Sequence, residues 1–590
     1  MTPGAVATDS EALLRQARDK FAKGRADDSR RLCEELIARD PANVEGLHLL
    51  AMLELASGNA GAALAPVERA SQADPGDARK HQTHGLVLRS LGRRDEAARA
   101  FARALSLSPE FPEAHGSLAL ARFEEGAFGE AARHFERALR VRADVYAWNF
   151  NLGLCRSNLG ELAGAVSAFQ RALQLNERMP EAHNNLGAAL MPLERLAEAE
   201  ASFRRCIELA PGHAHAWTNL GNVLRRTGRT REAQEAYWRA TQCEPPLALA
   251  WVNFGNALKD ADRVDDALGC FARAMSIEPA LAEAHLSRAI ACLLAGDLEQ
   301  GWDEYRWRLG AAPGAGVREA VRDAIGAKRS IEIRGEQGLG DALFFLRWAA
   351  VLHEAGARLS FRGDPRLYPL LERTRIFRKL GGEEGESLVL PAGDLPWVAA
   401  GMAAPHPPSL PLEASAAALE AAGSLLRAAG PPPYIGIAWK AGLASSGPSE
   451  HLHKMVPLED LGAALRTVPG TIVSLQRGAR APEIETLRGL AARPVLDAER
   501  VNLDLDATLG ILARLDDYAG VSSTNVHLRA GLGKAARILV PLPPEWRYGR
   551  SGSATPWFEG FGLYREEREG GWARALSTLA SDLARAHREP

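Results

Sequence analysis

The pattern of hydrophobic and polar residues in the first half of the chain repeats every 34 residues. In the copy that begins at Pro180, a Leu-Gly pair stands at positions 7 and 8, a turn residue stands near the middle, and a proline stands near the end. Copies begin at Val44, Ala78, Pro112, Tyr146, Pro180, Ala214, Ala248 and Ala282, and a weaker copy begins at about residue 9. Because Gly and Ala let helices approach closely and Pro cannot continue a helix, the pattern predicts nine helical hairpins over about 9–315.

The pattern changes after Ala315. Short strand-like runs then alternate with helical ones, which is typical of parallel sheets flanked by helices. The strand-like runs are 331–334, 357–361, 387–390, 434–439, 471–475, 517–522 and 536–541. We therefore expect an α + α/β protein with a helical repeat domain at 1–315 and two α/β domains at 316–430 and 431–590.

The 34-residue pattern resembles the tetratricopeptide repeat. The resemblance implies an α-solenoid, a right-handed superhelix of helical hairpins with a concave face. Asparagine recurs on the first helix of the hairpins, at repeat positions 6 and 9: Asn151, Asn185, Asn219, Asn222, Asn253 and Asn256. A row of amides could hold an extended acceptor protein by its backbone, as the similar repeats of the nucleocytoplasmic O-GlcNAc transferase do. Alternatively, the amides pack between repeats and bond to local backbone.

The amino-acid composition limits the kinds of binding partner and the cellular compartment that we expect for this protein. A formal net charge of -3 argues against a nucleic-acid-binding surface. The 6 cysteines show no metal-binding spacing, so they are predicted to be buried thiols of a reducing compartment. The chain has no basic leader followed by an apolar run and no stretch of about 18 apolar residues. We therefore expect a cytoplasmic protein without an integral membrane segment.

The segment GEQGLGDALFFLRW (335–348) follows a short apolar strand and leads to Asp341. Its glycines read GxxGxG and not GxGxxG, which argues against a nicotinamide enzyme. The segment resembles the opening of GT-B glycosyltransferases related to bacterial heptosyltransferases, which consist of two Rossmann-like domains. Such domains often follow a repeat that ends much like GWDEYRWRL (301–309). The resemblance implies that Asp341 is the catalytic carboxylate, although an aspartate at a helix start is also a common N-cap.

Three further residues match the donor side of these enzymes. Lys440 follows the strand IGIAW, Lys454 precedes a segment that relatives share, and Gln476 lies in SLQRG. The resemblance implies that the lysines neutralise a leaving phosphate and that Gln476 pairs with a base or ribose; either lysine could instead be a solvated end of an element. His451 and His453 lack a third ligand, so no metal site is predicted there.

The segment GVSSTNVHLRAGLGK (520–534) is the most specific match, since relatives read VDTSVAHLAGALGK. Free N–H groups at a helix start could bind a donor phosphate, although an ordinary capped Rossmann helix would look the same. The residues implied in donor binding are Ser522, Ser523, Thr524, Asn525, His527 and Arg529, together with Arg547 of a Pro-Glu-Trp-Arg motif. Ser522 replaces the usual aspartate and Arg529 a small residue, which favours an anionic ligand such as a carboxylated sugar.

Together these features predict an inverting protein O-glycosyltransferase that needs no metal or other cofactor. Asp341 would take the proton of a Ser or Thr hydroxyl while the opposite domain stabilises the departing nucleotide. Chains with this order of parts are similar to bacterial flagellin glycosyltransferases. The similarity implies flagellin as the acceptor, and CMP-pseudaminic acid or another nucleotide sugar as the donor.

Two alternatives remain at this point. The chain could be an interaction scaffold whose GT-B half is inactive, because the usual aspartate is absent at position 522. It could also transfer sugar to a lipid or a polysaccharide, which would leave the repeats without a role in substrate binding.

Overall fold

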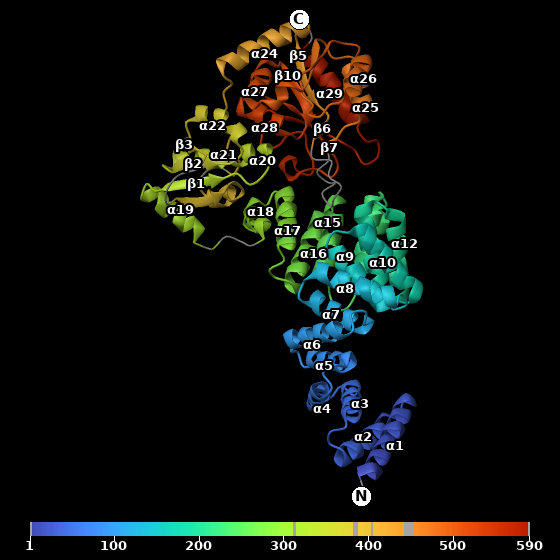
Figure 1. Ribbon diagram of the computed structural model, residues 1–590. Helices are drawn as coiled ribbons and strands as arrows, with labels where there is room; N and C mark the ends of the chain where they lie inside the picture. The colour runs from blue at the N-terminus through green and yellow to red at the C-terminus, as the bar shows by residue number, and fades with distance from the viewer. Residues whose placement is uncertain are drawn as a thin grey trace. The chain divides into compact units, whose positions relative to one another are not determined.

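The computed structural model describes residues 3–310, 314, 316–381, 387–402, 405–441 and 454–587, with side chains from residue 9 onward. It divides into two compact units, Met1–Arg229 and Thr230–Pro590. Figure 1 shows the chain from helical repeats to α/β lobes.

The unit Met1–Arg229 consists of antiparallel helical hairpins. Its helices are α1 (Pro3–Ala22), α2 (Ala26–Arg39), α3 (Val44–Ala56), α4 (Ala60–Ala73), α5 (Ala78–Ser90), α6 (Arg94–Leu107), α7 (Pro112–Glu124), α8 (Phe128–Val141), α9 (Tyr146–Asn158), α10 (Leu162–Leu175), α11 (Pro180–Leu190), η1 (Met191–Leu193), α12 (Leu196–Leu209) and α13 (Ala214–Arg226). From Val44 on, each predicted repeat start in this unit is the first residue of a helix. The glycine at repeat position 8 has a steric cause, since a Cβ on Gly187 would lie 2.6 Å from the ring of Phe203.

The unit Thr230–Pro590 begins with further repeat helices. These are α14 (Thr230–Thr241), α15 (Ala248–Asp260), α16 (Val264–Ile277), α17 (Ala282–Ala295), α18 (Leu298–Tyr305) and the short η2 (Arg306–Leu309). The last repeats therefore belong to the same compact unit as the α/β part, although the sequence suggested a boundary near 315.

The first α/β lobe contains a parallel sheet with the strand order β3-β2-β1-β4. Its elements are α19 (Val317–Gly326), β1 (Ser330–Arg334), α20 (Leu339–Phe345), α21 (Arg347–Glu354), β2 (Arg358–Arg362), η3 (Pro365–Leu367), α22 (Tyr368–Thr374), β3 (Phe377–Leu380), β4 (Leu388–Pro391), η4 (Ala392–Asp394) and α23 (Leu395–Val398). Every second residue along β1 and β2 points into the core of this lobe. These residues are fully buried: Ile331, Ile333, Leu359 and Phe361.

The second α/β lobe contains a parallel sheet with the order β12-β11-β10-β5-β8-β9. Its strands are β5 (Tyr434–Ala438), β8 (Thr471–Ser474), β9 (Val495–Asp497), β10 (Asp517–Val521), β11 (Arg537–Val540) and β12 (Gly562–Arg565), with a small antiparallel pair, β6 (Lys440–Ala441) and β7 (Lys454–Met455). Its helices are α24 (Ala416–Ala429), α25 (Leu458–Leu465), α26 (Ala481–Ala491), η6 (Val501–Leu503), α27 (Leu505–Arg514), α28 (Thr524–Gly531), η7 (Trp546–Tyr548) and α29 (Ala573–Ala586).

Helices cover both faces of this second sheet, as is usual for parallel sheets. Residues of α25, α26 and α29 share one apolar core with the sheet, and those of α27 and α28 share another that continues into the first lobe. Figure 1 shows the two helix groups on either side of β5 and β10. Helix α24 precedes the predicted boundary near 430 but packs on α27, where a Cβ on Gly510 would lie 2.6 Å from the carbonyl oxygen of Ala418.

Candidate active site

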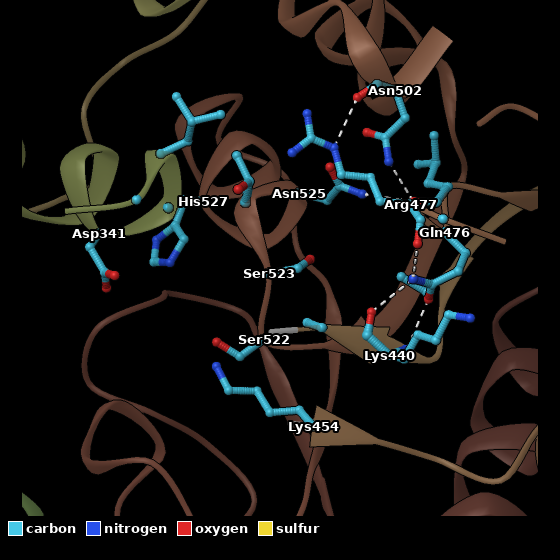
Figure 2. Close-up of a pocket in the computed structure, with 18 of the residues that line it drawn as sticks. Asp341, Lys440, Lys454, Gln476, Arg477, Asn502, Ser522, Ser523, Asn525 and His527 are labelled. Carbon is cyan, nitrogen blue, oxygen red and sulfur yellow. Dashed lines mark hydrogen bonds between the residues drawn. The ribbon is translucent and has the colours of Figure 1, made fainter. Parts of the chain in front are cut away.

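A cavity of about 620 Å³ lies between the two α/β lobes and collects most of the predicted site residues. The first lobe contributes Gly338, Leu339, Gly340 and Asp341, and the second contributes residues after β5, β8 and β10. Figure 2 shows Asp341 on one side of the cavity and Lys440 and Gln476 on the other. Ligand sites in open α/β sheets lie beyond the carboxyl ends of the strands, and this cavity has that position.

Asp341 extends into the cavity from the first turn of α20. Gly338 occupies the N-cap position, so the capping role considered for Asp341 does not apply. The Asp341 side chain is 39% exposed, and its Oδ1 accepts a hydrogen bond of 2.5 Å from Nη2 of Arg547. The carboxylate is thus accessible from the cavity while a cation of the opposite lobe fixes its direction.

Arg547, on η7, begins a chain of ion pairs along the cavity wall. Its Nη1 donates to Oε2 of Glu545 at 3.4 Å, and Nζ of Lys454 lies 2.6 Å from Oε1 of Glu545. Burial lowers the pKa of Arg547, but the charges of Asp341 and Glu545 outweigh this effect and raise it. Burial also opposes ionisation of Glu545, yet Lys454 and Arg547 hold the pKa of this carboxyl below its ordinary value. An anion that enters must therefore compete with carboxylates for these two cations.

Lys440 and Gln476 line the cavity, but their polar groups already have protein partners. The Lys440 ammonium donates to both carboxylate oxygens of Glu483, at 2.8 and 3.0 Å. The Gln476 Oε1 accepts hydrogen bonds from the N–H groups of Trp439 and Lys440, while its Nε2 donates to the carbonyls of Lys440 and Arg477. The amide of Gln476 is thus saturated and fixes the loop after β5. Pairing of this side chain with a base or ribose would require it to exchange partners, and it stays a prediction.

The turn from β10 into α28 contributes Ser522, Ser523, Thr524 and Asn525 to the cavity, as the sequence predicted. The Ser522 hydroxyl donates to Glu545 at 3.4 Å, and the Asn525 amide donates to the carbonyl of Leu475 at 3.4 Å. The N–H groups of this helix start point an electropositive end toward the cavity, which suits an anion.

His527, on the first turns of α28, lines the same cavity and is 7% exposed. Burial, together with the charges of Arg547, Arg347 and Lys454, holds the pKa of His527 well below its usual value, so the ring is neutral at physiological pH. Its Nδ1 is buried and has no hydrogen-bond partner among the described residues. It therefore offers one hydrogen-bonding position to a ligand.

Arg529 does not belong to the cavity. Its side chain is buried, and its guanidinium donates to the carbonyls of Leu512, Leu515 and Ala535 in the core of the second lobe. The prediction that Arg529 recognises an anionic sugar is therefore wrong, because the residue joins the ends of α27 and α28. Arg529 thus gives no support to a carboxylated donor.

The asparagines of the repeats bond mainly to nearby backbone or to neighbouring helices. Asn151, Asn185 and Asn253 each donate to the carbonyl four residues earlier in their own helix, at 2.8–2.9 Å. Asn219 donates to the side-chain oxygen of Asn184, and Asn256 donates to the hydroxyl of Ser287. Asn222, like the other five, is partly exposed. These contacts favour the packing role, and binding of an acceptor peptide by the amides stays a prediction.

The carboxylates that pair with the cavity lysines were not predicted from the sequence. Glu545 had a signal, because it stands two residues before Arg547 in the Pro-Glu-Trp-Arg motif. Glu483 had none, because it lies 43 residues from Lys440 on a different helix. Asn502, which also lines the cavity and donates to the carbonyl of Leu475, comes from the turn η6 and was likewise missed.

Two other sequence predictions concern metals and membranes. His451 and His453 lie outside the described residues. Across the part of the chain that is described, no group of three or more His, Cys, Asp or Glu side chains could hold a metal ion. Within the same part, no helix has both the length and the apolar character needed to cross a bilayer. A reaction without metal stays a prediction.

Family models of the tetratricopeptide repeat match the first part of the chain. One matches residues 178–243, and another matches 14–78, 83–144 and 123–180. Tetratricopeptide repeats thus form the N-terminal helical region, and such repeats indicate protein partners. No curated protein matches the chain.

Several solved structures share similarity with part of the chain. YrrB, described as a tetratricopeptide protein with an unusual peptide-binding site, is 27% identical over 31% of this chain and 95% of its own, with a TM-score of 0.30. MamA is 23% identical over 27% of this chain and 94% of its own, with a TM-score of 0.26. PilF of Pseudomonas aeruginosa is 16% identical over 36% and 96%, with a TM-score of 0.34.

Proposed function

We propose that the chain is a protein O-glycosyltransferase of the GT-B type, which binds a protein acceptor with its repeats and transfers a sugar from a nucleotide donor in the cavity. One observation carries the proposal. An accessible carboxylate of one lobe, Asp341, faces a helix start and two cations of the other lobe, Lys454 and Arg547, within a single cavity.

The reaction divides between the lobes. The acceptor hydroxyl oxygen attacks the anomeric carbon as the bond from that carbon to the phosphate oxygen breaks, which inverts the configuration. The hydroxyl proton goes to Oδ2 of Asp341, since Oδ1 accepts the bond from Arg547. The departing phosphate takes its electron pair into a region lined by Arg547, Lys454 and the N–H groups of α28, where the developing negative charge is stabilised.

Donor binding changes the ion pairs around Asp341. The phosphate competes with Asp341 and Glu545 for Arg547 and Lys454, so binding of the donor loosens the bond that holds the carboxylate. A carboxylate released from the guanidinium has both oxygens available to accept the hydrogen bond of the acceptor hydroxyl. We therefore expect the donor to bind before proton transfer becomes efficient.

Flagellin is the first acceptor to test, because of the resemblance of the whole chain to flagellin glycosyltransferases. CMP-pseudaminic acid is kept among the donors to test, without support from Arg529, whose guanidinium is bonded to backbone carbonyls.

The test combines donor binding and transfer. Purified protein is screened by thermal shift with UDP-, GDP-, ADP- and CMP-sugars, and the stabilising donor is then incubated with flagellin for intact-mass measurement. We expect flagellin to gain the mass of one or more sugars with the wild-type protein, and the rate to fall at least about 100-fold with Asp341→Asn. Asp323→Asn, on the exposed surface of α19, is the matched control. Equal transfer by wild type and Asp341→Asn would remove Asp341 from the mechanism.

A binding role without catalysis is the second candidate. Ser522 stands in place of the usual aspartate, and Lys440, Lys454 and Arg547 are each paired with a carboxylate. Both features favour a cavity that no longer binds a nucleotide sugar. In that case flagellin or another protein would bind the repeats, while none of the nucleotide sugars would stabilise the chain and no mass would be added.

A further inference from the structure

The last repeat ends in the segment Gly301–Leu309, GWDEYRWRL, which comprises the end of α18 and all of η2. It has no part in the proposed chemistry, and yet its side chains contact the elements that carry Asp341 and Arg547. Figure 1 shows α17 and α18 next to the α/β lobes within the unit Thr230–Pro590.

Arg308 is buried between two carboxylates of the first lobe. Its guanidinium donates to Oε1 of Glu336, with Nε at 2.9 Å, and to Oδ1 of Asp394 at 2.5 Å. The side chains of Arg308, Glu336 and Asp394 are 5%, 14% and 2% exposed. The same Oε1 of Glu336 accepts from the N–H of Gly393 at 2.8 Å. Glu336 lies in the loop from β1 to α20, so Arg308 ties that loop to η4.

Tyr305 and Gln337 form a second tie to this loop. Nε2 of Gln337 donates to the Tyr305 hydroxyl at 2.8 Å. Two consecutive loop residues, Glu336 and Gln337, are therefore held by side chains of the last repeat. Asp341 follows them at the start of α20, so the position of its carboxylate depends on where this loop is fixed.

Trp302 contacts both elements that meet in the cavity. Its ring lies edge-on to Phe345 of α20 with the centroids 6.2 Å apart, and edge-on to Trp546 of η7 with the centroids 5.3 Å apart. Trp546 precedes Arg547, and α17 also packs against η7. The indole is 6% exposed, so these contacts are buried and leave little room for independent movement.

We propose that Gly301–Leu309 is a positioning element of the cleft: Arg308 and Tyr305 fix the loop that leads to Asp341, and Trp302 sets η7 so that Arg547 meets Asp341. The segment does not touch the reacting atoms. Its effect on transfer rests on the proposed function, whereas its effect on the loop does not.

The first test is independent of catalysis. Hydrogen exchange of a peptide covering residues 335–345 is measured in the full chain for wild type, Arg308→Gln, Arg308→Lys and Tyr305→Phe. The matched control is Arg318→Gln, because Arg318 donates to the carbonyl of Trp397 and stacks on its ring in the same lobe without contacting the loop. We expect exchange to rise at least about 10-fold in Arg308→Gln, less in Arg308→Lys, and by less than about 2-fold in Arg318→Gln.

The second test follows the reaction. Tyr305→Phe removes the hydroxyl that binds Gln337 and keeps the ring. This milder variant also tests the positioning role if Arg308→Gln does not fold. We expect kcat to fall about 3- to 10-fold in Tyr305→Phe and further in Arg308→Lys, while the Kd of the donor nucleotide stays within about 2-fold, because the donor side of the cavity belongs to the other lobe.

The two tests separate the inference from the function. Unchanged exchange of 335–345 in both Arg308→Gln and Tyr305→Phe would overturn the positioning role, whatever the activity. Faster exchange in these variants, in a wild-type protein that transfers no sugar, would support the positioning role and remove the proposed function instead.

Discussion

The imidazole of His527 lies in the wall of the cavity, edge-on to the rings of Phe344 and Phe558. Burial and the neighbouring cations keep it neutral. An unfolded chain would protonate the same histidine near its ordinary pKa of about 6.5, whereas the folded chain would not. Below that pH the unfolded state binds more protons, so His527 makes the folded state less stable as the pH falls.

Because this effect of pH on stability requires the imidazole, it leads to a prediction for the variant His527→Gln. The stability of the wild type relative to the variant should drop by about 1.4 kcal/mol between pH 7.5 and pH 5.5, because only the wild type has this proton to bind on unfolding. Urea unfolding at both pH values measures it. His353→Gln, at an exposed position of α21, is the control. A pH-independent difference between wild type and His527→Gln would show that the ring binds a proton as readily in the folded state as in the unfolded state.

At the scale of residues, the sequence predicts which side chains gather but not what each one binds. Asp341, Lys454, the residues 522–525, His527 and Arg547 line one cavity, and motif resemblance was sufficient to find them. Gln476 and Arg529 have structural roles because their partners, such as the N–H of Trp439 and the carbonyl of Leu512, come from other elements. Motif resemblance does not reveal such partners, since they depend on how the elements pack.

At the scale of elements, α20 and α28 approach each other closely where the two lobes meet. A Cβ on Gly340 would lie 3.2 Å from Cδ2 of His527 and 3.6 Å from Cα of Thr524. Gly338, two residues earlier, has φ of -62°, and a Cβ added to it would meet open space. The same short segment thus contains one glycine against which a buried ring packs closely and one that faces open space.

We expect Gly340→Ala to destabilise the protein by about 1–3 kcal/mol, since the added methyl group forces the buried ring of His527 to shift. Gly338→Ala should stay within about 1 kcal/mol of the wild type, because the unfolded chain loses freedom and the folded chain meets no clash. Denaturant unfolding of the two variants side by side measures the difference. Equal stabilities would mean that the His527 ring can shift without cost.

The sequence predicted long or strongly apolar elements better than short ones. The repeat helices begin at the predicted residues because a pattern copied every 34 residues leaves little choice of register. Strands β3, β9 and β12 were missed. Each is short, and FRKL in β3 and GLYR in β12 carry exposed or half-exposed charges that hide the strand pattern.

At the scale of the whole molecule, the packing of the chain divides at Arg229 and not where the repeats end. Asp262, in the turn before α16, accepts a hydrogen bond of 2.8 Å from Nε of Arg550 in the second lobe. Together with Arg308 and Trp302, this contact makes the last repeats part of the α/β fold. The predicted boundary near 315 marks the point where the 34-residue sequence pattern ends. The end of a sequence pattern does not show where the packing of the chain divides.

The division of the chain at Arg229 predicts that two fragments differ in whether they fold stably. Residues 230–590 should fold and bind the donor with an affinity close to that of the full chain, but should transfer poorly to a protein because most repeats are gone. Residues 316–590 should be unstable, because Glu336 and Asp394 lose Arg308, and breaking a buried pair costs about 3–5 kcal/mol. Circular dichroism melting and donor titration test both. Equal melting temperatures would contradict the expectation.

The bond between Asp341 and Arg547 also has a consequence for how the protein is made. The two residues are 206 positions apart, so at about 5–20 residues per second a ribosome adds the arginine roughly 10–40 s after the aspartate. Helical repeats can fold one after another as they emerge. A nascent chain therefore completes its repeats well before its cleft. If the proposed function holds, an acceptor protein can bind the repeats before the site that modifies it exists.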